Sequence, residues 1–535
     1  MKNLLLLLLF TIHCSLFTVK AQQGEWTWMN GDSTNSLGHY GNLGVFDAIN
    51  SPPSLYEACE WTDFNGNFWL FGGGGPTSVY SDLWEFKPST NQWAWIKGPG
   101  IPNQNGNYGN KGVPSPSNNP GSRTQGMATW TDLSGSLWMM GGRGDAINNE
   151  YGFLNDLWKF DIANNEWTWM GGTDTIDDLG NYGLLQVPSI TNNPPSRAET
   201  NATWVDQTGN LWYFGGLGST SGSYSDLWKY DVSINEWIWM NGSNTVNQVP
   251  IYGIKGIPDS ANTPGGRWAC FAKWKDHRGD FWLFGGEGFY GLSNDLWKYN
   301  STTNKWTWMS GTNMADDTGT AGSQCLGDTM NIPSGRRENR ACWTRPCDNF
   351  VNFGGLNGTN NDLWNYSVSN NQWTFLAGFN NPNYGTKLVS SPINSPPSRG
   401  GSLGWTDNLG NLWMFGGKNS PYTIFYNDMW KFIPDSTCPY ISCSNLGMID
   451  PKLTSSSITL YPNPNNGTFT LHSQLGINNY ELQIVDVYGR TVYSQALTTT
   501  KEHETITLPL SSGIYFWQLL SKDNSLAKGK LVLMQ

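Results

Sequence analysis

The segment NDLWKF at residues 155–160 decides the fold, because close variants of it recur along the chain. Such fixed-period similarity is the mark of a repeat architecture, in which each unit must pack against its neighbours. The period is roughly 66 to 74 residues, and the tryptophan of the segment returns six times, at Trp84, Trp158, Trp228, Trp297, Trp364 and Trp430.

Each repeat contains four short aromatic stretches, and all but two of the 30 tryptophans, Trp268 and Trp517, belong to them. In WTWM at residues 167–170 the alternation places both tryptophans on one face of a strand. The LWMF stretch at residues 412–415 predicts a buried strand, since a Gly-Gly pair ends it. Four strands in each of six repeats predict an all-β fold of six twisted sheets.

The Gly-Gly pairs, such as Gly141-Gly142, have two possible explanations. A backbone conformation closed to residues with a Cβ, or the close approach of a neighbouring sheet, is the structural one. A phosphate-binding loop would need a following Gly-Lys-Ser/Thr and a helix, and neither is present. We therefore expect the pairs to be structural.

These repeats resemble the kelch repeat: an apolar strand, Gly-Gly, a variable loop, an aromatic strand, a polar turn and a tryptophan. The resemblance covers residues 26–432 and implies a six-bladed β-propeller. WTWM at residues 26–29 precedes the first complete repeat, and no such strand follows Asp428 to Phe432. Because a ring must close to hide its sheet edges, we expect the N-terminal strand to complete the sixth blade, with Trp28 paired antiparallel to the strand of Trp430.

The C-terminal segment has a different pattern, with short alternating strands separated by Asn-Gly, Gly-Arg and Ser-Gly turns, which predict a small β-sandwich. YPNP at 461–464, YGR at 488–490, SGIYF at 512–516 and the lysine-rich final strand at 528–533 resemble the C-terminal sorting domain of the type IX secretion system. The resemblance implies transfer across the outer membrane by that machinery. An ordinary adhesion sandwich is the alternative.

The N-terminus predicts a cleavable signal peptide, with Lys2 before an apolar run from Leu4 to Ile12 that is too short to span a bilayer. We expect no transmembrane segment, a secreted or outer-membrane surface location, and a monomer. The expected division is a signal peptide at 1–21, the propeller at 22–434, a linker at 435–457 and the sorting domain at 458–535.

Export permits disulfides, and the close pairs Cys342/Cys347 and Cys438/Cys443 are the candidates by spacing. Cys59 and Cys270 fall inside apolar strand patterns. For these two cysteines, a role as small buried hydrophobic residues is as good an interpretation as disulfide formation.

Candidate binding residues lie on the face from which the longer loops emerge. By strand parity, the loop between the second and third strands and the crossover to the next repeat share one face, which we call the long-loop face; examples are residues 142–155 and 98–122. Loops on a rigid scaffold often carry function. An arginine and a tyrosine recur there in most repeats, at Arg123, Arg197, Arg267, Arg336 and Arg399, and at Tyr108, Tyr182, Tyr252 and Tyr384, with Leu55 in the first arginine position and Tyr40 in the first tyrosine position.

Two interpretations of this set compete. An arginine-lined mouth could bind an anionic or glycan ligand, since arginine forks bind carboxylates and aromatic rings stack on sugars. Alternatively, each arginine pairs with the aspartate of its own NDLW segment and each tyrosine covers a seam between blades. Repetition in nearly every blade favours the second interpretation.

Other chemistry has little support in the sequence. A net charge of −11 leaves no basic surface for nucleic acid. No metal site or cofactor is expected: the acidic loops TDTIDDLG and ADDTG lack EF-hand spacing, and the histidines and cysteines do not match the copper site of kelch-type oxidases. No catalytic motif stands out. The leading hypothesis is a non-enzymatic protein that binds a glycan or protein; the alternatives are a carbohydrate-active lyase, hydrolase or mutarotase, and a purely structural surface protein.

Overall fold

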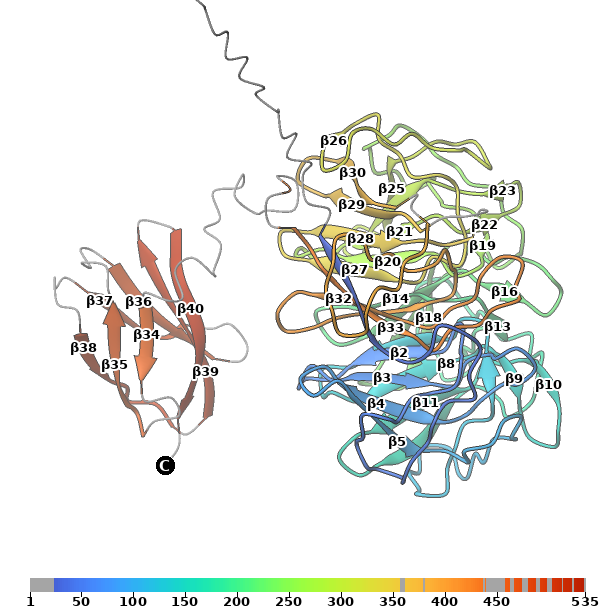
Figure 1. Cartoon of the computed structure of the whole chain (residues 1–535), viewed down its shortest axis with the longest axis horizontal. Coiled ribbons are helices and arrows are strands. Elements are labelled where there is room, and N and C mark those ends of the chain that lie inside the picture. Colours follow the sequence, from blue (N-terminus) through green and yellow to red (C-terminus); the bar gives the residue numbers. More distant parts are fainter. Residues whose placement is uncertain are drawn as a thin grey trace, which may run out of the picture. The chain divides into compact units, whose positions relative to one another are not determined.

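The computed structural model describes residues 24–356, 361–378, 381–435, 438, 458–461, 466–473, 480–486, 491–497, 503–511, 513–521 and 524–533. The expected signal peptide and most of the expected linker lie outside this set. The chain divides into two compact units, residues 1–441 and 442–535. The described residues form strands and turns, with no α-helix (Figure 1). Within them, no helix is long and apolar enough to cross a membrane.

The first unit repeats one antiparallel sheet of four strands along the sequence. In five sheets the strands follow chain order; the sixth takes its outer strand from the N-terminus. The sheets are β2 (Cys59–Thr62), β3 (Phe68–Phe71), β4 (Leu83–Lys87) and β5 (Gln92–Lys97); β7 (Ala128–Thr131), β8 (Leu137–Met140), β11 (Leu157–Asp161) and β12 (Glu166–Gly171); β14 (Ala202–Val205), β15 (Leu211–Phe214), β17 (Leu227–Asp231) and β18 (Glu236–Asn241); β20 (Ala272–Lys275), β21 (Phe281–Phe284), β24 (Leu296–Asn300) and β25 (Lys305–Ser310); β27 (Cys342–Arg345), β28 (Asn349–Phe353), β29 (Leu363–Ser367) and β30 (Gln372–Ala377), to which β26 (Gly327–Asp328) adds; and β31 (Leu403–Thr406), β32 (Leu412–Phe415), β33 (Met429–Ile433) and β1 (Glu25–Asn30).

The longer loops carry short strands of their own. They form three small antiparallel sheets, which are β6 (Arg123–Thr124), β9 (Arg143–Asp145) and β10 (Tyr151–Phe153); β13 (Arg197–Ala198) and β16 (Leu217–Gly218); and β19 (Arg267–Trp268), β22 (Glu287–Gly288) and β23 (Gly291–Leu292).

The strand pattern follows from the sequence pattern. The four residues of β8 are all buried, as expected for a second strand covered on both faces. At its end, Gly141 and Gly142 have φ of 72° and 91°. A Cβ on Gly141 would lie 2.8 Å from the carbonyl oxygen of Arg197 in the next sheet. The structural explanation of this Gly-Gly pair is therefore confirmed, and both of its stated causes operate.

The first strands of the six sheets contact one another in a closed cycle, β2 to β7, β14, β20, β27, β31 and back to β2. Indole hydrogen bonds reinforce neighbouring sheets within this cycle. For example, Trp61 Nε1 donates to the carbonyl of Trp138 at 2.9 Å, and Trp130 Nε1 donates to the carbonyl of Trp212 at 2.8 Å. A buried indole N–H needs such an acceptor.

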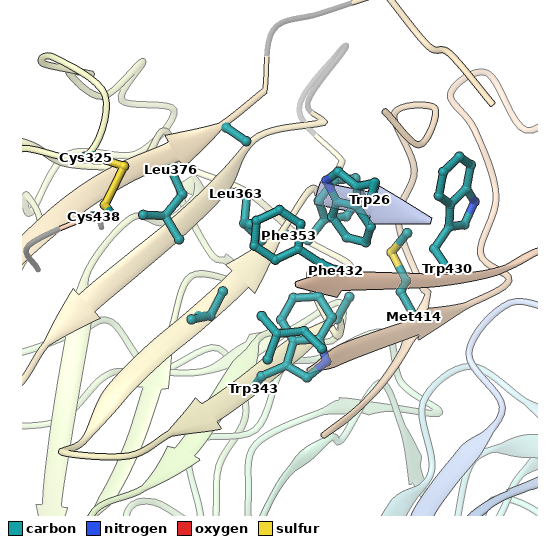
Figure 2. Close-up of a cluster of buried hydrophobic side chains, with 14 residues drawn as sticks. Trp26, Cys325, Trp343, Phe353, Leu363, Leu376, Met414, Trp430, Phe432 and Cys438 are labelled. Carbon is teal, nitrogen blue, oxygen red and sulfur yellow. A yellow bond between two sulfur atoms is a disulfide. The ribbon is translucent and has the colours of Figure 1, made fainter. Parts of the chain in front are cut away.

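The N-terminal strand β1 pairs antiparallel with β33, with Trp28 opposite Trp430 and Trp26 opposite Phe432. This confirms the expected pairing. Figure 2 shows Trp26 among Phe353, Phe432 and Trp430. The ring centroids of Trp26 and Phe432 are 4.9 Å apart, and those of Trp26 and Phe353 are 5.4 Å apart. The strand thus joins the fifth and sixth sheets through one aromatic cluster.

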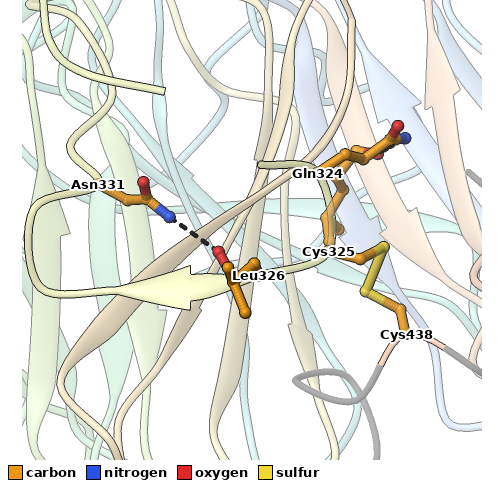
Figure 3. Close-up of a disulfide and its surroundings, with 6 residues drawn as sticks. Gln324, Cys325, Leu326, Asn331 and Cys438 are labelled. Atoms are coloured by element: carbon orange, nitrogen blue, oxygen red, sulfur yellow. Dashed lines mark hydrogen bonds between the residues drawn. A yellow bond between two sulfur atoms is a disulfide. The ribbon is translucent and has the colours of Figure 1, made fainter. Parts of the chain in front are cut away.

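The expected disulfide pairs are wrong. Cys438 is bonded to Cys325, which lies in the crossover before the fifth sheet, with their Cα atoms 5.3 Å apart (Figure 3). Cys342 is a free thiol, and its Sγ donates to the carbonyl of Lys273 in the adjacent β20. Spacing along the chain misled the prediction because the fold brings distant cysteines within bonding distance. Cys59 and Cys270 are buried free cysteines.

The second unit contains two antiparallel sheets that share one buried cluster. Phe469, Leu471 and Ile506 come from one sheet, and Leu482, Ile484, Trp517 and Leu519 come from the other. The sheets are β34 (Ile458–Tyr461), β35 (Thr468–Ser473) and β38 (His503–Thr507), and β37 (Thr491–Leu497), β36 (Tyr480–Val485), β39 (Gly513–Ser521) and β40 (Asn524–Leu533).

Candidate functional site

The five recurring arginines form buried ion pairs with the aspartate of their own repeat. Arg123 is representative: its Nη1 and Nη2 donate to Oδ1 and Oδ2 of Asp156 at 2.7 and 2.8 Å, and its Nε donates to the carbonyl of Gly121. Burial disfavours the charge, but the Asp156 carboxylate outweighs it and keeps the pKa of Arg123 above its ordinary value. The remaining pairs are Arg197–Asp226, Arg267–Asp295, Arg336–Asp362 and Arg399–Asp428.

The recurring tyrosines meet the same aspartates. Tyr108 donates its hydroxyl proton to Asp156 at 2.7 Å, and Trp158 Nε1 donates to the same oxygen. Burial, reinforced by the Asp156 charge, raises the pKa of Tyr108 well above its ordinary value, so the hydroxyl remains a donor. The same bond joins Tyr182 to Asp226, Tyr252 to Asp295 and Tyr384 to Asp428.

Four of these aspartates therefore hold the recurring arginine, the crossover tyrosine and the third strand of a repeat together, and they are Asp156, Asp226, Asp295 and Asp428. In the fifth repeat Asp362 joins Arg336 to Trp364 of the third strand. These contacts are those of the structural interpretation. The tyrosine ring also packs against the sheet that follows it: Tyr108 is tilted against Trp158 at 5.0 Å and edge to face with Trp169 at 5.1 Å, centroid to centroid. The ligand-binding interpretation of the same residues stays a prediction.

The first repeat departs from this arrangement, since Leu55 stands where the others have arginine. Asp82 still accepts from the Tyr40 hydroxyl at 2.7 Å and from the Gly100 N–H at 2.8 Å. Burial raises the pKa of Asp82 to about 6, because these hydrogen bonds offset only part of the desolvation.

A small cavity of about 140 Å³ opens on the long-loop face of the fourth sheet. Arg267 and Tyr252, both candidate residues from the sequence, contribute to its wall, together with Phe289, Tyr290 and Met314. The side chains of Phe289 and Tyr290 are 61% and 66% exposed, and their rings meet edge to face at 5.3 Å. Two adjacent exposed aromatics beside a cavity can stack on an apolar ligand face.

The sequence analysis did not single out Phe289 and Tyr290. A signal was available: GFYG at residues 288–291 places two aromatics in a loop between the second and third strands, outside the four aromatic stretches of the repeat. Both residues interrupt the repeat, so a pattern of recurring residues does not include them.

A second hollow, of about 530 Å³, lies among the short turns between the second and third sheets. Its wall mixes apolar residues such as Leu133 with the charged residues Asp132, Lys159 and Asp231. No exposed aromatic pair accompanies it in its lining. The cavity at Phe289 is therefore the better candidate for a binding site.

Comparison with known families identifies the C-terminal unit. Residues 459–534 match the family described as the secretion system C-terminal sorting domain. The chain thus carries a type IX sorting domain, which directs a protein to the cell surface or to secretion. No curated protein matches the sequence.

Proposed function

We propose that residues 22–434 form a six-bladed β-propeller of kelch type, delivered by the sorting domain at 458–535 after removal of the signal peptide at 1–21. The closed cycle of contacts among β2, β7, β14, β20, β27 and β31 supports this proposal. The pairing of β1 with β33 supports it as well, since the N-terminal strand gives the last sheet its fourth strand and joins the two ends of the repeat region.

We propose further that this propeller binds a glycan through the cavity at Phe289 and Tyr290 and does not catalyse a reaction of it. The observation that carries the proposal is the exposed aromatic pair in the lining of a cavity, where the neighbouring Arg267 is fixed by its ion pair with Asp295. Aromatic faces supply contact area to sugar rings at little conformational cost, and a fixed lining residue limits the ordering that binding requires. A protein ligand would use the same surface.

A panel of immobilised neutral and acidic oligosaccharides, probed with the full chain, tests the proposal. Phe289→Ala and Tyr290→Ala should each reduce binding to the captured glycan by roughly tenfold or more, which corresponds to about 1.4 kcal/mol. Phe64→Ala is the matched control, because Phe64 is an equally exposed aromatic in a short turn. Equal binding by all three variants would contradict the site, and turnover of a captured sugar would favour the carbohydrate-active enzyme.

Removal of residues 458–535 tests the division of labour. The remaining chain should keep its tryptophan fluorescence and cooperative unfolding, because the buried clusters described in the first unit are built from that unit's own residues. It should no longer reach the cell exterior of its host. Surface delivery of the truncated protein, measured by protease accessibility on whole cells, would contradict the proposed role of the C-terminal unit.

A further inference from the structure

Six equivalent residues, one from each repeat, form a ring whose members are linked by backbone hydrogen bonds. Each stands two positions after the arginine, or after Leu55, that begins the inner segment of its repeat, and each has a left-handed backbone with φ between 50° and 68°. The six are Glu57, Gln125, Glu199, Ala269, Glu338 and Gly401. Left-handed φ is uncommon for residues other than glycine, so its recurrence marks a constrained backbone.

Backbone hydrogen bonds join members of this ring from one sheet to the next. The N–H of Glu57 donates to the carbonyl of Gly401 at 2.8 Å, and the N–H of Gly401 donates to the carbonyl of Glu338 at 2.7 Å. Glu338 in turn donates to Ala269, and Glu199 donates to Gln125. Residues far apart in the sequence are thereby held around one point, and carboxylates stand in the first, third and fifth positions.

Three potential metal ligands converge there. A carboxylate oxygen of Glu57, a carboxylate oxygen of Glu199 and Sγ of Cys270 all lie within 4.8 Å of one another, and all three side chains are buried. Cys270 Sγ is 3.3 Å from Oε2 of Glu199. The ligands come from the first, third and fourth repeats.

Glu57 supplies the second observation. It is 0% exposed, yet neither of its carboxylate oxygens has a hydrogen-bond partner among the described residues. An isolated buried carboxylate is costly, and it is normally paired or coordinated to a metal. One of these unpaired carboxylate oxygens lies within 4.8 Å of the Glu199 and Cys270 ligand atoms, so a metal ion bound among them would supply its missing partner.

The nearby cations lie close enough for Lys418 and Arg340 to interact electrostatically with Glu57, but their direct ion pairs are with other carboxylates. Lys418 forms an ion pair with Glu338 at 3.4 Å, Arg340 pairs with Glu60, and Arg337 pairs with Glu287. Within the described part of the chain, no lysine or arginine forms an ion pair with Glu57 or Glu199. A bound cation would therefore be the direct ionic partner that the Glu57 and Glu199 carboxylates otherwise lack among the described residues.

We propose that Glu57, Glu199 and Cys270 bind one divalent transition metal ion of the Zn²⁺ type, a site that the sequence analysis did not foresee. Two carboxylates and a thiol suit Zn²⁺, which accepts both sulfur and oxygen, whereas Ca²⁺ and Mg²⁺ take oxygen ligands alone. On binding, the Cys270 thiol releases its proton to solvent and coordinates as the thiolate. The ion would join three of the six repeats at the centre of the ring.

Metal binding to the full chain tests this site. After chelator treatment, the protein should take up one Zn²⁺ per chain by equilibrium dialysis and elemental analysis, with a rise in melting temperature, because a ligand that binds only the folded state stabilises it. Loading with Co²⁺ should give the near-ultraviolet thiolate-to-cobalt charge-transfer band that reports a cysteine ligand.

Variants then assign the ligands. Glu57→Gln, Glu199→Gln and Cys270→Ser should each weaken Zn²⁺ binding by at least about 100-fold, beyond the roughly 10- to 100-fold typical of residues behind the ligands. Cys270→Ser should also abolish the cobalt band. Cys342→Ser is the matched control, because Cys342 is another free cysteine outside the cluster, and it should change neither.

The contrary outcomes are distinct. A folded chain that takes up neither Zn²⁺ nor Co²⁺ would overturn the site. Uptake of Ca²⁺ with no cobalt band would overturn the metal class and the role of Cys270, and a band that survives Cys270→Ser but is lost in Cys342→Ser would place the metal elsewhere. If a variant fails to fold, the wild-type stoichiometry and the cobalt band still decide. Glycan binding at Phe289 is a separate measurement, so the two proposals fail independently.

Discussion

Trp28 lies directly opposite Trp430 in an antiparallel pair, so the first and last strands of the repeat region form one sheet. A continuous chain thereby closes its ring by hydrogen bonds rather than by a covalent link. The packing along the tryptophan-bearing face of β1 is unequal: Trp26 is buried between the fifth and sixth sheets, whereas Trp28 is half-buried beside Tyr384.

Replacing Trp26 should therefore loosen the closure more than replacing Trp28. Trp26→Ala removes a buried ring that contacts Phe353 and Phe432, and we expect it to lower the free energy of unfolding by about 3 to 5 kcal/mol. Trp28→Ala should cost clearly less. Urea unfolding followed by fluorescence measures both, and an equal or reversed order would contradict the unequal packing.

The arginine–aspartate pairs should contribute to stability rather than only to recognition. Arg197→Ala leaves the Asp226 carboxylate buried without its cation, and such a loss typically costs about 3 to 5 kcal/mol. We expect similar losses for Arg123, Arg267, Arg336 and Arg399. Thermal melts measure them, with the exposed Arg278→Ala as the control. Unchanged melting temperatures across the five variants would refute the structural role and return these residues to ligand binding.

Asp82 should make stability depend on pH, because Leu55 stands where the other repeats have an arginine that pairs with the aspartate. Its pKa is raised in the folded state to about 6, above the value of about 3.9 in an unfolded chain. The raised pKa favours folding fully below pH 4, and this contribution is lost as the pH rises through 6.

The wild type should therefore lose stability relative to Asp82→Asn between pH 4 and 6.5, by on the order of 2 to 3 kcal/mol, and no further above pH 7. Urea unfolding at several pH values measures the difference. Asp47→Asn, at an exposed position, controls for loss of a charge. A difference that stays flat across this range would show that Asp82 ionises as it does in water.

The Cys325–Cys438 disulfide should stabilise the end of the repeat region. It closes a loop with a sequence separation of 113 residues, and a bond of this kind typically contributes about 2 to 4 kcal/mol. Cys325→Ser and Cys438→Ser should lower stability equally, and the double variant should add no further loss. Cys342→Ser, which removes a free thiol, is the control. Additive losses in the double variant would show that the two cysteines act separately.

The local elements of this protein could be predicted from its sequence because they depend on short-range patterns. Alternation in WTWM predicted strand faces, and the buried run before each Gly-Gly pair predicted strand ends. The extra WTWM strand at residues 26–29 predicted the antiparallel pairing with the strand of Trp430. The sorting domain could also be predicted from the sequence, since its turn motifs lie in order along one short segment. The family match at residues 459–534 confirms it.

The tertiary structure alone decided which distant residues meet. The bond from Cys438 to Cys325, the aromatic pair at Phe289 and Tyr290 beside Arg267, and the convergence of Glu57, Glu199 and Cys270 all depend on distances across the ring. A repeat pattern specifies each sheet and the contact with its neighbour, so recurring residues are visible in the sequence. Donors contributed singly by different repeats become neighbours only when the ring closes, because closure, not local propensity, sets the separation between their side chains.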